Sequence, residues 1–354
     1  MPYQENKSST ELFSEVDACL DKEIPFVLYK LPGVNEINWI VDNQESANQD
    51  TCFVFHPFDA GQKEYSLSLN SIYTTQLEDI PDPGSSDTVP LDTDTSAKNK
   101  FINLVKDAQH AIGRGEFQKV VLSRPVVVPV NRDPKELFCH LAHTYSNAFC
   151  YWWYHPTTGQ WLGASPELLL ATLNNEVEVM SLAGTRKSKA GETVAWNEKE
   201  KEEQSIVTGY IRDILEKHGS VVTEEGPETI QAGSLEHLST QFKATLTSSP
   251  ANLVKELHPT PAICGVPKDG ALQFIERHEG YARKYYTGYL GLLSDDPEFP
   301  TQLYVNLRCM SYNKNKVTVY VGCGITAASD PHMEWQETID KCQTMFKILD
   351  ISSY

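Results

Sequence analysis

Short β-branched strands joined by tight turns constrain the fold of this 354-residue chain more than any other feature. The clearest strand is QKVVLSRPVVVPV (118–130), which is rich in Val and shows no helical period. Residues 149–183 then alternate apolar runs with a Thr-Thr-Gly turn and an Asn-Asn turn, a pattern typical of hairpin-linked strands. Helical segments are inserted among these hairpins. We therefore expect an α+β fold and not a doubly wound parallel sheet.

The helices are marked by apolar residues at helical spacing between recognisable capping residues. Asp133, Pro134 and Glu136 form the pattern of an N-cap, a first-turn proline and a capping glutamate. Other helices are expected over 98–115, closing at Gly113 or Gly115, over 198–218, over 269–286, and from Asp330 and Pro331 towards the end of the chain.

The formal charge of −18 argues against a nucleic-acid or anionic membrane partner, because phosphates would meet a repulsive surface. There is no run of eighteen apolar residues and no signal-peptide pattern at the N-terminus, so we expect a cytoplasmic protein without a membrane span. The eight cysteines are scattered without a CxxC pair, which favours reduced, buried thiols over disulfides or zinc. To bind a small anion, such a protein needs a local pocket of basic groups, backbone N–H groups or a divalent cation.

Glu203 falls in the apolar stripe of the helix expected over 198–218. A carboxylate that faces inward needs a partner, although a first-turn glutamate can also fray into solvent. On the last helix, Glu334, Glu337 and Lys341 are spaced i, i+3 and i+7 and flank the core stripe. The alternative for these three residues is an exposed face of surface salt bridges.

Two further residues could carry acid–base chemistry. Lys119 begins the strand 118–130, where it either faces a pocket as a desolvated amine or lies in water at a sheet edge. Glu167 begins the apolar strand LLLATL and is either held against apolar walls, which would raise its pKa, or solvated at the strand end.

Four residues could bind an anionic ligand. Gly322 and Gly324 in VGCGI would allow close approach to backbone N–H groups. Arg308 lies in the apolar strand LYVNLRCM and suits a carboxylate, with a cross-strand ion pair as the alternative. His237 is ambiguous between a ligand and a hydrogen-bonded core residue.

Ten stretches of the chain, in the same order, are similar to the chorismate-binding enzyme family. They are QKVVLSR (118–124), WLGASPELLL (161–170), SLAGTRK (181–187), KEKEEQSIV (199–207), EHLSTQF (236–242), LHPTPAICGVPK (257–268), YTGYLGLL (286–293), LYVNLRCM (303–310), VGCGI (321–325) and EWQETIDKCQTM (334–345). The resemblance implies one α+β domain of antiparallel sheets packed as a sandwich with helices outside. Residues 96–354 would form its catalytic core. Residues 1–95 would be a strand-rich, loosely matching part of the same domain.

The resemblance also implies roles for the residues in these stretches. Lys119 resembles the general base that activates water, and Glu167 the general acid. Glu203 and Glu334 resemble ligands of Mg²⁺, with Glu337 beside the metal. Tyr286, Arg308 and the N–H groups around Gly322 and Gly324 resemble the groups that bind the substrate's enolpyruvyl carboxylate. His237, Ala262 and Lys341 resemble residues that line the same pocket. Gln204 departs from the family's common His, and we expect it to adjust the surroundings of the metal without removing it.

Within the family, HPTPA (258–262) resembles the isochorismate synthase branch. Ala183 stands where aminodeoxychorismate synthases have a nucleophilic Lys, which argues against a covalent lysine intermediate. The implied reaction is Mg²⁺-dependent addition of water to C2 of chorismate with loss of the C4 hydroxyl, by a monomer without a glutaminase subunit. The alternatives are a salicylate synthase, which would also eliminate pyruvate, and a non-catalytic chorismate-binding subunit. Menaquinone, siderophore and salicylate pathways all remain open for the product.

Overall fold

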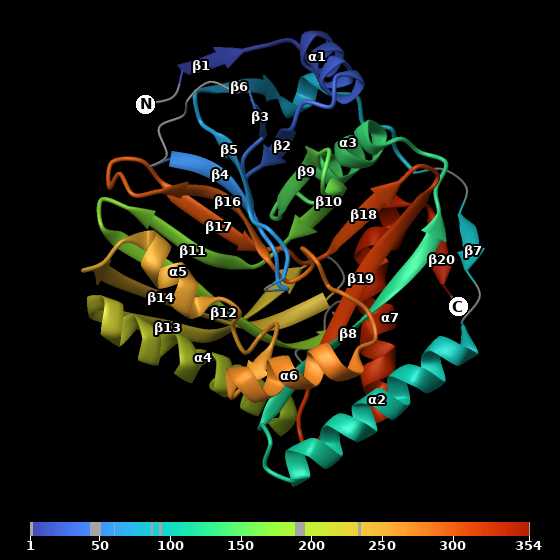
Figure 1. Cartoon of the computed structure of the whole chain (residues 1–354), viewed down its shortest axis with the longest axis vertical. Helices are drawn as coiled ribbons and strands as arrows, with labels where there is room; N and C mark the ends of the chain where they lie inside the picture. Colours follow the sequence, from blue (N-terminus) through green and yellow to red (C-terminus); the bar gives the residue numbers. More distant parts are fainter. Residues whose placement is uncertain are drawn as a thin grey trace.

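The computed structural model describes residues 3–42, 51–59, 61–85, 88–91, 94–187, 195–232 and 235–353. Most strands belong to two large sheets (Figure 1). The ten-stranded sheet has the order β1 (Tyr3–Asn6), β6 (Ser71–Gln76), β3 (Glu36–Val41), β2 (Phe26–Lys30), β9 (Phe149–His155), β10 (Gly159–Ser165), β18 (Cys309–Asn313), β19 (Lys316–Ile325), β8 (Lys119–Pro129) and β15 (Gly265–Val266). The β1–β6 pair is parallel, and the other neighbours in this sheet are antiparallel.

The second sheet has eight antiparallel strands in the order β13 (Gly219–Ala232), β14 (Leu235–Leu246), β12 (Glu176–Lys187), β11 (Leu168–Leu173), β17 (Thr301–Val305), β16 (Tyr289–Ser294), β4 (Thr51–His56) and β5 (Tyr65–Ser68). A small parallel pair joins β7 (Val89–Leu91) to β20 (Ile351–Ser353). Because β2 pairs with β9 and β4 pairs with β16, strands from the first 95 residues extend both sheets.

Strand β9 shows how the core is built. Phe149, Tyr151 and Trp153 point into a cluster shared with β4, β16 and β17 of the other sheet. Cys150 and Trp152 alternate with them and pack on the opposite face, in the cluster that includes the helices of that side. The strand is therefore buried on both faces, which explains why its sequence reads as one continuous apolar run. The prediction of an α+β sandwich is confirmed.

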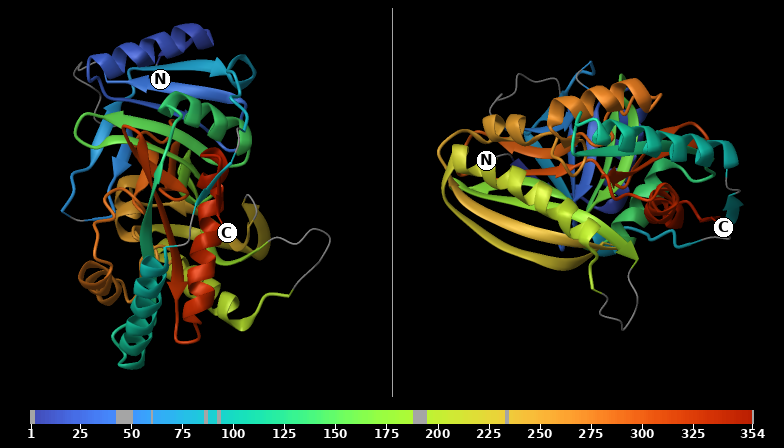
Figure 2. Two further views of the ribbon diagram at one scale, coloured as in Figure 1. Left: turned by 90° about the vertical axis from the view of Figure 1, so that its right-hand side faces the viewer. Right: turned by 90° about the horizontal axis from the view of Figure 1, so that it is seen from below.

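Helices cover the outer faces of the sandwich (Figure 2). The eight-stranded sheet is covered by α4 (Glu198–His218) and α5 (Pro250–Leu257), and the ten-stranded sheet by α1 (Ser9–Asp21), α3 (Pro134–Thr144) and α7 (Pro331–Ile348). The helices α2 (Thr95–Gly113) and α6 (Lys268–His278) pack near the start of β8, and η1 (Leu77–Asp79) is a single 3₁₀ turn. The capping box predicted for Asp133 and Glu136 is present in both directions.

The helix expected over 269–286 is wrong in its extent, because α6 ends at His278. Gly280 adopts φ +74° and Lys284 φ +55°, left-handed conformations that a continuing helix does not contain. The chain instead turns back, and Arg283 is buried where it donates to the carbonyl oxygens of Val121 and Ile263. This turn carries Tyr286 to the candidate site.

All eight cysteines are free thiols, and seven of them are buried, as predicted. Among the described residues, no helix is both long and apolar enough to cross a membrane.

Candidate active site

A cavity opens between the end of the ten-stranded sheet at β8 and β19 and the strands β12 and β14 of the other sheet. Nine of the twelve residues singled out from the sequence line this cavity: Glu167, Glu203, His237, Ala262, Tyr286, Arg308, Gly322, Gly324 and Lys341. A second cavity of about 1080 Å³ adjoins it and shares Pro166 and Arg308, so the arginine lies between the two spaces.

Lys119 and Glu203 form a buried ion pair, with the Lys119 Nζ 3.0 Å from the Glu203 Oε1. Lys119 is fully buried at the start of β8, so the alternative of an edge-strand lysine in water is wrong. Glu203 is also buried on the inner face of α4 and does not fray into solvent. Burial alone would raise the pKa of Glu203, but the ammonium groups of Lys119 and Lys199 lower it to about 2. This carboxyl group is therefore ionised.

Gly324 makes room for this pair. A Cβ atom built on Gly324 would lie 2.1 Å from the Glu203 Oε1 and 3.0 Å from the Lys119 Cε. The register of β19 against β8 explains the proximity, because Gly324 pairs with Val121, two residues after Lys119. The glycine at position 324 thus leaves space for the carboxylate of Glu203, whereas the sequence pattern indicated space for a bound ligand.

Glu167 is buried between β10 and β11, so the alternative of a solvated strand end is wrong. Burial raises the pKa of Glu167 to about 8, and the positive charges of Lys119, Lys341 and Arg308 limit this rise. The carboxyl group is therefore protonated near neutral pH and can donate a proton into the cavity.

His237 orients Arg308. The His237 Nδ1 lies 3.0 Å from the carbonyl oxygen of Gly184, which can only accept a hydrogen bond, so Nδ1 carries the proton. The Nε2 atom then accepts from the Arg308 Nη2 at 3.2 Å. Burial, followed by the positive charge of Arg308, lowers the pKa of His237 to about 3. His237 is accordingly neutral and holds Arg308 in place through a hydrogen bond. The backbone of Arg308 itself adopts φ +47°.

Tyr286 and Lys341 complete the wall on the side of β19. A Cβ atom on Gly322 would lie 3.1 Å from the Tyr286 hydroxyl and 2.7 Å from the Leu122 carbonyl oxygen, so the glycine lets the phenol approach the sheet. The Lys341 Nζ donates to the Gly322 carbonyl oxygen at 2.9 Å. Burial raises the pKa of Tyr286, which keeps the phenol a neutral hydrogen-bond donor.

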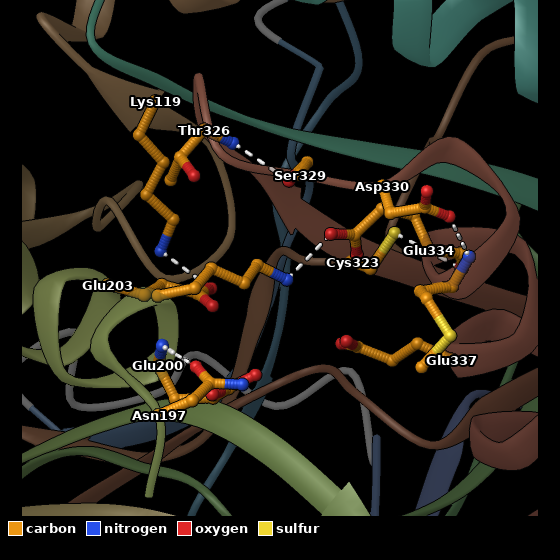
Figure 3. A network of polar contacts seen from close by, with 12 residues as sticks. Lys119, Asn197, Glu200, Glu203, Cys323, Thr326, Ser329, Asp330, Glu334 and Glu337 are labelled. Atoms are coloured by element: carbon orange, nitrogen blue, oxygen red, sulfur yellow. Dashed lines mark hydrogen bonds and ion pairs between the residues drawn. The ribbon is translucent and has the colours of Figure 1, made fainter.

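The carboxylates predicted to hold a metal, Glu203, Glu334 and Glu337, lie near one another (Figure 3). Each of them is paired with a lysine side chain. Glu334 is only 2% exposed, so it does not belong to an exposed face, and its Oε1 lies 2.6 Å from the Lys199 Nζ. Glu337 pairs with Lys341 at 2.7 Å. Among the described residues, no three His, Cys, Asp or Glu side chains are already arranged to hold a metal ion.

The donor chemistry nevertheless fits Mg²⁺. Carboxylate oxygens are its preferred protein ligands, and one or two of them usually suffice. The Glu334 Oε2 is buried and has no hydrogen-bond partner among the described residues, although the Ser329 hydroxyl is near enough to influence its pKa. Glu203 and Glu334 are the residues that would hold the ion, with Glu337 beside them.

Gln204, where the family commonly has His, points away from the cavity. Its Nε2 donates to the Ser181 carbonyl oxygen at 3.3 Å and to the Thr240 hydroxyl at 3.1 Å. The amide thus links α4 to β12 and β14 behind Glu203.

Two residues that support the site were not predicted from the sequence. Arg283 pairs with Glu279 and ties the loop that carries Tyr286 to β8. Lys199 neutralises Glu334. Of these two residues, only Lys199 could have been predicted from the sequence, because it lies four positions before Glu203 on one face of α4.

Comparison with known proteins agrees with this site. The family model for chorismate binding enzymes matches residues 27–347. The isochorismate synthase EntC of Escherichia coli K12 is 31% identical over 266 residues, which cover 71% of this chain and 67% of EntC. The isochorismate synthase MenF of the same strain is 28% identical over 300 residues, 82% of this chain and 67% of MenF. The salicylate biosynthesis isochorismate synthase of Pseudomonas aeruginosa is 29% identical, covering 81% of this chain and 63% of its own length.

Solved structures agree on the fold. The DhbC structure of Bacillus anthracis superposes with a TM-score of 0.79 at 24% identity, covering 96% of this chain and 99% of the other. The MenF structure of Escherichia coli gives 0.76 at 21% identity, covering 92% and 88%. The chain spans about two thirds of the length of the curated relatives it matches. The family predicted from ten ordered motifs is confirmed, and the chain belongs to the chorismate-binding enzyme family.

Proposed function

We propose that this enzyme is an isochorismate synthase, which interconverts chorismate and isochorismate by adding water at C2 and removing the C4 hydroxyl. One observation carries the proposal. The protonated carboxyl of Glu167 lines the cavity beside an arginine held by His237, and the Lys119 side chain lies directly behind the cavity wall, paired with the lining residue Glu203 and close enough for its charge to act on Glu167. An amine and a carboxylic acid are the base and the acid that such an exchange of hydroxyl groups needs.

In the proposed reaction, the Lys119 ammonium group, which is paired with Glu203, first releases its proton to solvent. The neutral amine then accepts a proton from water as the water oxygen bonds to C2. The ring double bonds shift, the C4–O bond breaks, and Glu167 supplies the proton with which the hydroxyl leaves as water. Substrate and product are isomers, so the reverse reaction uses the same two residues with their roles exchanged. Arg308 and Tyr286 supply the hydrogen bonds for the enolpyruvyl carboxylate.

The same proposal includes Mg²⁺ as the cofactor. Bound by Glu203 and Glu334, it would take up the ring carboxylate and offset the negative charge that shifts during attack. This accounts for the binding of a dianion by a chain of charge −18, since acidic residues reach the substrate through a cation.

Ala183 supports water as the nucleophile. It lines the cavity, and its methyl group has no atom that could bond to the ring. A lysine side chain at this position can attack the substrate covalently, whereas Ala183 leaves space for a water molecule.

The proposal is tested by running the reaction in ¹⁸O-labelled water with chorismate and Mg²⁺ and analysing early products by mass spectrometry. Isochorismate carrying one ¹⁸O atom, at C2, is expected. Unlabelled isochorismate would contradict direct attack by water. Formation of salicylate and pyruvate would favour a salicylate synthase instead.

A further inference from the structure

Lys199 holds the position that a cation would occupy among the carboxylates beside the cavity. It lies one helical turn before Glu203 on α4, and its Nζ is 2.6 Å from the Glu334 Oε1. The charges of Glu337, Glu203 and Glu334 all act on its ammonium group. One lysine thus compensates three carboxylates that come from two helices.

This contact differs from a surface ion pair. Two residues further along α4, Lys201 pairs with Glu198 at 2.8 Å, but these side chains are 55% and 92% exposed. The corresponding exposures for Lys199 and Glu334 are 16% and 2%. Buried carboxylates without a counter-charge are costly, and the Lys199 ammonium group supplies that counter-charge when no metal is bound.

The geometry also leaves Lys199 free to move. The side chain retains some exposure to solvent, and its flexible four-carbon stem can turn outward without moving the helix. Glu334 lies in the first turn of a different helix, α7, and is buried there. Its second carboxylate oxygen has no hydrogen-bond partner among the described residues and is available to a second cation.

We propose that Lys199 is an internal counter-cation that holds Glu334 in the metal-free protein, turns into solvent when a divalent cation binds, and thereby sets the metal affinity. The inference rests on the proposed metal site and extends it. Because the metal must displace an ammonium group, its affinity is lower than the carboxylates alone would give. In return, the carboxylate cluster remains compensated, and the fold stable, without metal.

The first test compares Lys199→Gln with the parent and with Lys201→Gln, a matched control on the same helix. Mg²⁺ affinity is measured by calorimetry without chorismate, and the melting temperature is measured in EDTA and in Mg²⁺. Lys199→Gln is expected to bind Mg²⁺ about tenfold more tightly, to melt lower than the parent in EDTA and to regain the difference in Mg²⁺. Lys201→Gln should match the parent. Equal or weaker Mg²⁺ binding by Lys199→Gln would overturn the inference.

The second test uses the unmutated protein and does not depend on the folding of a variant. Lysines are acetylated briefly with and without Mg²⁺, and the modification of each is quantified by mass spectrometry. Mg²⁺ should raise the labelling of Lys199 several-fold and leave that of Lys201 unchanged. If the parent binds Mg²⁺ but Lys199 labelling stays constant or falls, the inference alone fails. If the parent binds no Mg²⁺ at all, the metal site and the inference fail together, whereas the production of isochorismate is judged separately.

Discussion

The carboxylate of Glu203 lies so close to the backbone of Gly324 that a single methyl group on this glycine would come within 2.1 Å of its Oε1. The same space admits the Lys119 side chain, 3.0 Å from that carboxylate. The chemistry proposed for Lys119 and Glu203 thus depends on a glycine, which has no side chain, at position 324 of β19.

Gly324→Ala should therefore displace Glu203 and disrupt its ion pair. Overpacking of this kind costs about 1–3 kcal/mol, and we expect a loss of stability in that range together with a severe loss of activity. Urea unfolding and turnover of chorismate measure the two effects. The matched control is Gly209→Ala on α4, where a Cβ atom meets nothing within 4 Å and helix propensity should add about 0.5–1 kcal/mol. Normal activity in Gly324→Ala would contradict the geometry described for Glu203.

Lys119→Ala should remove the base. Isochorismate formation is expected to fall by roughly 10²–10⁴-fold, because this is the usual contribution of a positioned base. Chorismate binding, measured by calorimetry in Mg²⁺, should change much less, since the carboxylate contacts remain. Lys243→Ala, at an exposed lysine of β14, serves as the control and should behave as the parent. Full activity of Lys119→Ala would exclude this amine as the base.

The raised pKa of Glu167 predicts a pH limit for the reaction. The group is a proton donor only below its pKa of about 8, so the rate from chorismate should decline as the pH rises through that value. A rate profile that stays level to pH 9.5 would argue against Glu167 as the acid.

The same group makes the folded protein less stable at high pH. Its pKa in the folded state lies above its ordinary value of 4.5, so its contribution to stability is complete below pH 4.5 and is lost as the pH rises through about 8. Glu167→Gln removes this dependence. Compared with the parent, the variant should be relatively more stable at pH 9 than at pH 5, which melting curves at both values would show. A constant difference would mean that the carboxyl group is not buried in neutral form.

His237→Phe should weaken substrate binding more than it slows the chemical step. The change removes the acceptor that holds Arg308, and a hydrogen bond to a charged group contributes about 1.5–3 kcal/mol. We expect a rise in KM of about tenfold or more with a smaller change in kcat. Because the pKa of His237 is about 3, the pH profile near 6.5 should not change. The loss of a limb in that profile would instead identify the histidine as a proton-transfer group.

The main outline of the fold could be predicted from the sequence because periodicity and capping are local signals. The helix over 198–218 and the capping box at Asp133 were found at their observed positions. The helix predicted over 269–286 was too long because Gly280 is tolerated in a helical pattern, and only the burial of Arg283 beneath β8 shows why the chain turns. That burial depends on residues 162 positions away.

The site was harder to predict than the fold. Geometry along one helix placed Glu203 on an inward face, but it could not bring Glu334 or Lys119 to it, since those contacts join separate elements. The family resemblance supplied that convergence. It did not indicate that Lys199 neutralises Glu334, because a motif gives residue types and not the partner that each side chain selects.

The measurement that bears most directly on the proposed function is the product spectrum of the purified protein with chorismate, followed by NMR with Mg²⁺ and with EDTA. We predict isochorismate in equilibrium with chorismate in Mg²⁺, little conversion in EDTA, and neither salicylate nor pyruvate. Unchanged chorismate under both conditions would contradict the assignment.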